Sequence, residues 1–216
     1  MSLTTAGHEG ATNFGLGTAG AKTSGSLDWL WARLQDNPHP CVLDCGPVRS
    51  STVNVLLERG SRLHVADLLS LVSRSDGKLW DHSGKAPVFR TERLLSELPT
   101  IHPGSVSIVF CWQLLDLLPR EALADVVHRM YFYLEPGGVL FFVLREACLT
   151  TGADAIWYLE TLTKLTALAT SQKPFLYPPL SNREMERLIP AGIVKTVLTR
   201  SGLREVLAVR SSPTSR

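Results

Sequence analysis

A strand, a turn, a helix and a second strand follow one another between residues 41 and 67, and this order constrains the fold most. Cys41–Cys45 is a short apolar run typical of a buried strand, and a Gly-Pro pair ends it. A helix over residues 50–60 follows, and Leu63–Ala66 predicts another strand that ends at Asp67. Such a unit requires parallel strands joined by a right-handed crossover.

The rest of the chain continues this alternation of strands and helices. Further strands are predicted at Val88–Phe89, Val106–Cys111, Val139–Leu144, Ile193–Leu198 and Leu203–Val209. Helices are predicted at Leu27–Leu34, 91–98, 119–134 and from Ser181 to Pro190. A further helix is predicted from Asp154, because Leu159, Leu162, Leu165 and Leu168 form a stripe. The pattern predicts an α/β fold with a mostly parallel sheet and a C-terminal antiparallel strand.

One domain accounts for most of the chain, because 216 residues suit a single hydrophobic core. Residues 1–25 are rich in Gly, Thr, Ala and Ser without a hydrophobic period, so we expect a disordered tail. The alternative is a segment that folds over a ligand. Order is expected to begin at Ser26, as a helix N-cap, which gives a domain over residues 26–212.

Composition excludes several classes of protein and site. The net charge of +2 gives no general electrostatic case for nucleic acid or membrane as a partner. The segment from Lys173 to Arg216 is locally basic, which fits a solvated face better than a polyanion site. The four cysteines match no zinc spacing, so no metal is expected. Without a leader or a membrane-spanning run, the cytoplasm is the default location.

Leu134-Glu-Pro-Gly-Gly-Val-Leu140 is the most specific motif, because proline halts a helix and two glycines permit a sharp reversal. This motif, together with the strand ending in Asp44 and Gly46 and the strand ending at Asp67, resembles the S-adenosylmethionine-dependent methyltransferase superfamily. The resemblance covers about residues 27–210. It implies a Rossmann-like methyltransferase fold and S-adenosylmethionine as the cofactor.

The resemblance also assigns cofactor-binding residues. Asp44 and Gly46 correspond to the first motif, where a strand ends in an acid and a turn lets the backbone approach the cofactor. Asp67 corresponds to the acid that accepts hydrogen bonds from the ribose hydroxyls. Cys111 and Trp112 stand where the methionine end of the cofactor meets the acceptor. Trp112 can contact the sulfonium through its ring face or pack against the edge of the sheet.

The first motif departs from the pattern of the family. Gly-x-Gly-x-Gly is expected, whereas Pro47, Val48, Arg49 and Ser50 follow Gly46. The Val48 side chain narrows the space in which the amino-acid part of the cofactor would approach the backbone. Arg49 can face the carboxylate of the cofactor or a different anion. The altered turn favours a protein that has lost catalysis.

Two functions follow from these observations. One is a methyltransferase acting on a small molecule or a protein side chain, with an acceptor pocket built by Trp112, the helix from Asp154 and the loop Lys173–Pro179. Phe175 and Tyr177 in that loop can line the pocket or anchor the loop. The other is a non-catalytic scaffold that binds a protein partner. No catalytic group is identified, since methyl transfer depends on alignment more than on acids or bases. Asp116 can orient an acceptor or lie exposed.

Overall fold

A six-stranded sheet forms the centre of the computed structural model, which describes residues 19–74, 77–146, 151–174, 176–190, 192–199 and 203–212. The strand order is β10-β11-β7-β6-β2-β3. The strands are β2 (Cys41–Asp44), β3 (Arg62–Val65), β6 (Val106–Trp112), β7 (Leu134–Arg145), β10 (Gly192–Leu198) and β11 (Leu203–Arg210). β3, β2, β6 and β7 run parallel, and β11 is antiparallel to β7 and to β10. The predicted fold class is confirmed.

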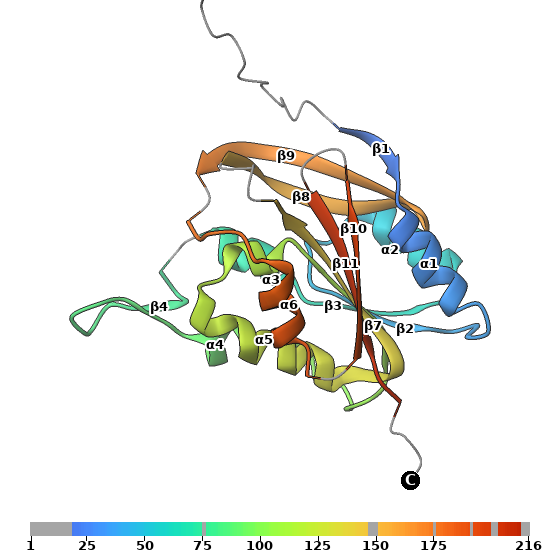
Figure 1. Ribbon diagram of the computed structural model, residues 1–216, viewed down its shortest axis with the longest axis horizontal. Helices are drawn as coiled ribbons and strands as arrows, with labels where there is room; N and C mark the ends of the chain where they lie inside the picture. The colour runs from blue at the N-terminus through green and yellow to red at the C-terminus, as the bar shows by residue number, and fades with distance from the viewer. Residues whose placement is uncertain are drawn as a thin grey trace, which may run out of the picture.

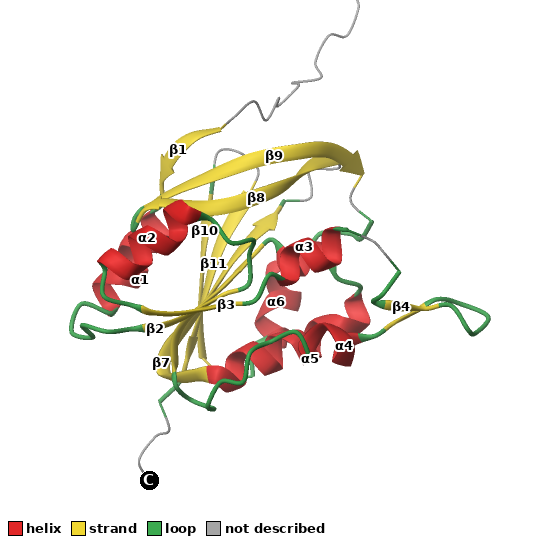
Figure 2. Ribbon diagram, turned by 180° about the vertical axis from the view of Figure 1, so that it is seen from behind, coloured by secondary structure: helices red, strands yellow, loops and turns green. Residues whose placement is uncertain are grey.

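Helices cover both faces of this sheet, as Figures 1 and 2 show. The helices are α1 (Gly25–Arg33), α2 (Ser50–Glu58), α3 (Leu68–Ser73), α4 (Thr91–Leu95), α5 (Arg120–Tyr133) and α6 (Asn182–Leu188), with a 3₁₀ turn η1 (Leu114–Leu117) after β6. Residues of α1 and α2 share a core with one face of the sheet, and residues of α3–α6 share a second core with the other. All seven residues of β6 are buried, which is why that strand reads as a continuous apolar run.

The Pro-Gly-Gly segment lies inside β7 near its start, where the register of β7 against β6 shifts between the Val106–Leu134 and Ile108–Val139 pairs, and not in a turn before the strand as predicted. Gly137 has a φ of +83°, in the left-handed region that favours glycine. A Cβ at Gly138 would lie 2.9 Å from the carbonyl oxygens of Glu135 and Val106. The two glycines therefore allow the chain to turn against its own backbone. The predicted capping box of α6 is also present, between Ser181 and Glu184.

The helix predicted from Asp154 is wrong. Residues 151–174 form an antiparallel hairpin, β8 (Thr151–Thr161) and β9 (Lys164–Pro174), which belongs to a separate three-stranded sheet with β1 (Ala19–Thr23). Leu159 pairs directly with Leu165, and both are buried. The leucine spacing that suggested one helical face arises because the turn at Leu162 brings two strands together.

The N-terminal boundary also differs from the prediction. Residues 1–18 lie outside the described residues, but Ala19–Thr23 form β1 and pair with β9. Ser24, rather than Ser26, is the N-cap of α1, and its hydroxyl accepts a hydrogen bond from the Leu27 amide at 3.1 Å. Residues before 26 therefore belong to the folded domain, which corrects the predicted boundary.

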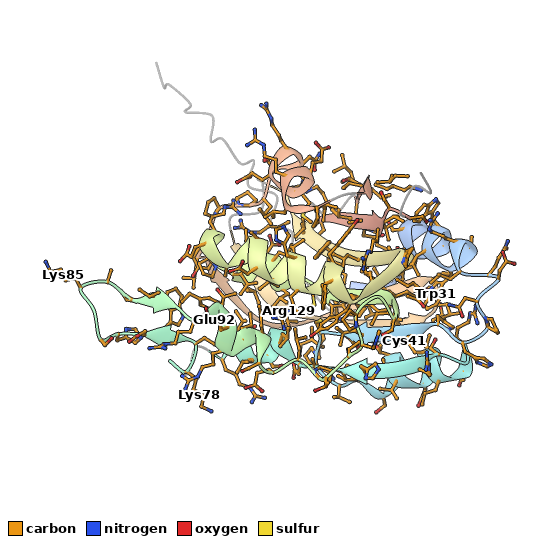
Figure 3. All side chains as sticks on the ribbon, turned by 90° about the horizontal axis from the view of Figure 1, so that it is seen from below. Trp31, Cys41, Lys78, Lys85, Glu92 and Arg129 are labelled. Carbon is orange, nitrogen blue, oxygen red and sulfur yellow. The ribbon has the colours of Figure 1, made fainter. Side chains whose placement is uncertain are left out.

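A two-stranded ribbon, β4 (Trp80–Asp81) and β5 (Val88–Phe89), projects from the domain. Figure 3 shows Lys85 at its tip, far from Trp31 and Cys41 at the opposite end of the molecule. Val88–Phe89 is thus a strand, as predicted, but it lies outside the main sheet. No helix within the described residues is long and apolar enough to cross a membrane.

Candidate functional site

The predicted site residues gather at the carboxyl ends of β2, β3 and β6. These strands are adjacent and parallel, so their carboxyl ends meet at one edge of the sheet. Asp44 ends β2, Asp67 follows β3, and Cys111 and Trp112 end β6. In open α/β sheets this edge is where ligands bind.

Asp44, Gly46 and Trp112 form one buried hydrogen-bonded group. The indole Nε1–H of Trp112 donates to Asp44 Oδ1 at 2.6 Å, and the Gly46 amide donates to the same oxygen at 2.9 Å. Asp44 is 3% exposed and Trp112 is 1% exposed. Burial raises the pKa of Asp44 above its ordinary value, the two hydrogen bonds oppose this rise, and the nearby Asp67 carboxylate adds to it.

The indole of Trp112 lies directly against the Gly46 turn. A Cβ at Gly46 would come within 2.7 Å of both Cδ1 and Nε1 of the ring. Gly46 is therefore needed for the close approach of the chain's own indole, whereas the sequence predicted an approach of the cofactor. This contact fills the face of the turn that a cofactor would otherwise use.

Backbone strain accompanies the position of Trp112. Its φ is +50°, a left-handed value that is unusual for a residue with a bulky side chain. The indole stacks on Phe110 with ring centroids 5.1 Å apart and meets Phe141 edge-on at 6.1 Å. Strain of this kind persists only where surrounding contacts hold the residue, and it is frequent at functional sites.

Asp67 has a structural role that the sequence did not predict. It is the N-cap of α3, and its Oδ1 accepts a hydrogen bond from the Ser70 amide at 2.9 Å. The residue is only partly buried. Capping uses one carboxylate oxygen and leaves Oδ2 available for another donor.

Cys111 lies on the other side of the sheet from Trp112. Its side chain is fully buried in the core beneath α3–α6, whereas Trp112 belongs to the core beneath α1 and α2. There it adjoins Cys45, whose pKa is raised well above the ordinary value, first by interaction with the Cys111 thiol and then by burial. The structure thus separates Cys111 from the Asp44–Trp112 pair.

The β8–β9 hairpin covers this edge of the sheet, which sequence reasoning missed because it predicted a helix there. The Trp157 indole donates to Gln113 Oε1 at 2.9 Å, just after β6. The Leu159 amide donates to Thr52 Oγ1 at 3.0 Å, which attaches β8 to α2. Figure 2 shows the hairpin lying across α1 and α2.

A groove of about 370 Å³ remains between the start of α2 and the hairpin. Its lining includes Val48, Arg49, Tyr158 and Leu168. Arg49, predicted to face the cofactor carboxylate or another anion, therefore lies beside this groove. Val48, whose side chain is exposed, also lines this groove, at a position where the motif that the sequence resembles has glycine.

The predicted acceptor loop is held by arginines. Arg120 donates to the carbonyl oxygens of Pro178 and Pro179 at 3.0 Å, and Arg145 donates to that of Tyr177. Tyr177 borders a small cavity of about 40 Å³, and burial raises its pKa. Phe175 lies outside the described residues. The cavity walls are mostly apolar and come from Leu71, Val72, Gly77, Leu79, Trp80, Phe89, Leu117, Leu176 and Tyr177.

Asp116 is buried rather than exposed. It is 4% exposed, and its Oδ2 accepts a hydrogen bond from the Arg145 amide at 2.8 Å. Burial raises the pKa of Asp116 to about 6, although that hydrogen bond and the charges of Arg145, Arg204 and Arg120 lower it. Asp116 therefore anchors Arg145, which in turn donates to the Tyr177 carbonyl oxygen.

Comparison with solved structures finds methyltransferases. The 1,6-didemethyltoxoflavin-N1-methyltransferase of Burkholderia thailandensis, with bound 1,6-didemethyltoxoflavin and S-adenosylhomocysteine, is 15% identical, with a TM-score of 0.45 over 88% of this chain and 80% of that one. A SAM-dependent methyltransferase of Methanosarcina mazei is 16% identical, with a TM-score of 0.43 over 85% and 97%. One from Archaeoglobus fulgidus is 12% identical, with a TM-score of 0.44 over 86% and 95%.

These structures belong to the superfamily that the sequence motifs resemble. At such identities and TM-scores, the assignment of the fold rests on the strand order and strand directions described above. No family model and no curated protein matches the sequence. Among the described residues, no group of three or more His, Cys, Asp and Glu side chains could hold a metal ion.

Proposed function

We propose that the chain is an S-adenosylmethionine-dependent methyltransferase that acts on a small molecule. The observation that carries this proposal is the position of two carboxylates on either side of the Gly46 turn. Asp44 pairs with Val65, two residues before Asp67, so both acids stand at the ends of adjacent parallel strands. Ligands of open α/β sheets bind at this edge.

The ribose side of the site fits such a cofactor. Asp67 is partly exposed. The hydrogen bond from the Ser70 amide to Oδ1 fixes the carboxylate and thereby orients its other oxygen, Oδ2. A carboxylate held in this way can accept hydrogen bonds from ribose hydroxyls. When bound, the cofactor supplies an electrophilic methyl group on a sulfonium, so the protein needs only to orient an acceptor. The groove of about 370 Å³ beside Val48 and Arg49 has a volume that a small acceptor requires, whereas the cavity of about 40 Å³ beside Tyr177 is too small.

The part of the site that would hold the methionine end of the cofactor does not fit it while the Trp112 indole fills that space. The indole covers Gly46 and takes up the Asp44 carboxylate, and both side chains are almost fully buried. This observation favours a second candidate, a non-catalytic scaffold of the same fold that binds a protein partner. A fold alone establishes no chemistry, so the two candidates must be separated by ligand binding.

Titration calorimetry with S-adenosylhomocysteine separates them. We expect the wild-type protein to bind and Asp67→Asn to bind roughly tenfold more weakly or worse, since a charged acceptor is lost. Asparagine is as good an N-cap as aspartate, so the variant should keep α3 and the fold. Asp36→Asn, at an exposed position on the loop after α1, is the matched control and should bind like the wild type.

Two results would contradict the proposal in different ways. Absence of binding at millimolar ligand, with an unchanged melting temperature, would reject the enzyme and leave the scaffold. Binding that Asp67→Asn does not weaken would retain the cofactor and overturn the placement of its ribose.

A further inference from the structure

Strand β10 is an apolar edge of the main sheet. Among the described strands it pairs with β11 alone, and it ends the strand order on that side (Figure 1). Ile193 and Leu198, near its two ends, are 68% and 69% exposed. Long, apolar edge strands readily pair with another chain, and proteins usually protect them.

The hydrogen bonds to β11 show which backbone groups face the free edge. Thr199 pairs with Leu203, and its amide donates to the Leu203 carbonyl oxygen at 2.8 Å. Because hydrogen-bonded pairs alternate along an antiparallel ladder and the register has no shift, the odd-numbered residues of β10 bond to β11. The N–H and C=O groups of Val194, Thr196 and Leu198 therefore point outward.

This outward set is complementary to itself. Two identical strands can pair side by side about a two-fold axis perpendicular to the sheet, and the central residue then lies opposite its own copy. With Thr196 at the centre, Val194 lies opposite Leu198 of the second copy, and all the outward-pointing groups of these three residues are paired. With Lys195 at the centre, two like charges would face each other, which is unfavourable.

We propose that β10 is the interface of a symmetric dimer in which Thr196 lies opposite Thr196 of a second copy. The main sheet then continues from one copy into the other. On one face, each exposed Leu198 side chain is covered by Val194 of the other copy. On the opposite face, each Lys195 lies beside Val197 of the other copy and keeps its contact with Trp29, 4.9 Å from the ring centroid.

Such an interface closes after two copies, because both contribute the same surface. Threonine pairs are favourable directly across antiparallel strands. The chain's net charge of only +2 produces little repulsion between copies. These features favour a second copy of this chain over an unrelated strand.

Sedimentation equilibrium of the full chain tests the interface. We expect the wild type to form dimers in a concentration-dependent manner, and Thr196→Pro to raise the dimer dissociation constant roughly tenfold or more, since two interchain hydrogen bonds are lost. The Thr196 amide faces the free edge, where proline is tolerated. A wild type that stays monomeric at the highest soluble concentration would overturn the proposal, and so would a folded Thr196→Pro variant that dimerises like the wild type.

Cysteine cross-linking tests the register and does not depend on the proline variant. Hydrogen-bonded pairs place Cα atoms about 5.5 Å apart, within the range of a disulfide. Thr196→Cys should therefore form a covalent dimer on mild oxidation, seen on a non-reducing gel. In Leu198→Cys the two introduced thiols would be about 13 Å apart along the strands. If Leu198→Cys or the wild type cross-links as fast as Thr196→Cys, the register is wrong and the proposal is overturned.

Discussion

The Trp112 indole and the Asp44 carboxylate form a 2.6 Å hydrogen bond that closes the end of β2 against the end of β6. The bond joins residues of two adjacent strands within an almost fully buried environment. An unpaired carboxylate in that environment would pay its desolvation cost without compensation. The pair therefore supports the shape of the site and also decides whether a ligand can reach Gly46.

Trp112→Phe should destabilise the protein in a pH-dependent manner. The substitution keeps the stacking on Phe110 but removes a donor to the Asp44 carboxylate, which should cost about 1.5–3 kcal/mol at pH 8. Burial already raises the pKa of Asp44, and the loss of this donor raises it further. The pH-dependent part of the cost should therefore disappear where Asp44 is protonated in both the folded and the unfolded protein, which leaves the loss of a neutral hydrogen bond and of packing. Urea unfolding at pH 8 and near pH 3.5 measures both effects.

Trp157→Phe is the matched control for this prediction. It removes an indole donor from the neutral Gln113 side chain at 2.9 Å. The expected loss is about 1 kcal/mol, and it should be the same at both pH values. A loss in Trp112→Phe that does not change with pH would show that the indole does not stabilise the ionised carboxylate.

Gly46→Ala should destabilise the fold through the indole and not through the turn itself. The new Cβ would lie 2.7 Å from two ring atoms of Trp112, so the ring or the turn must move, at a cost of about 1–3 kcal/mol. The same change in a Trp112→Leu background should cost at least about 1 kcal/mol less. Denaturant unfolding of the wild type, the two single variants and the double variant gives the coupling free energy between the two positions. Additive effects would mean that Gly46 is required for another reason.

The main sheet was predictable because each of its strands is an apolar run bounded by strong turn residues. The irregularity at Gly137 and Gly138 and the capping box at Ser181 each require particular residue types, so their sequence patterns were informative, although the two glycines lie inside β7 and not before it. The acids at the ends of β2 and β3 were found for the same reason. Parallel strands place such residues on one edge irrespective of the details of packing.

The β8–β9 hairpin, which covers the candidate site, was not predictable in the same way. Leucines recur at every third position from Leu159 to Leu168, which suggested a helical stripe, and only the reversal at Leu162 makes Leu159 and Leu165 a cross-strand pair. That reversal is stabilised by contacts with distant residues, including the bond from the Leu159 amide to Thr52. The role of Trp112 likewise depends on a partner 68 residues away in the sequence, which local patterns do not reveal.

Deletions at the N-terminus should show a sharp boundary between residues 18 and 24. Removal of residues 1–18 should leave the melting temperature nearly unchanged, because that segment has few apolar side chains. Removal through Ser24 eliminates β1, the α1 cap and the hydrogen bond from Ser24 to Glu205, and should lower the melting temperature by several degrees. Thermal unfolding compares the two. A large loss from the shorter deletion would indicate that residues 1–18 pack against the domain.

Asp116 should make stability fall as the pH rises from about 4 to above 6. Its folded-state pKa of about 6 lies above the ordinary value of 3.8, so the folded protein binds the proton more tightly than the unfolded chain in this window. The difference corresponds to about 3 kcal/mol lost across the window. Asp116→Asn should remove this slope in urea unfolding between pH 4 and 7. Glu184→Gln should keep this fall and make it slightly steeper near pH 4 to 5, since hydrogen bonds from Ser181 lower the pKa of that exposed carboxylate and its own contribution to stability rises with pH. An equal slope in the wild type and Asp116→Asn would show that Asp116 is ionised throughout and that its arginine partners outweigh its burial.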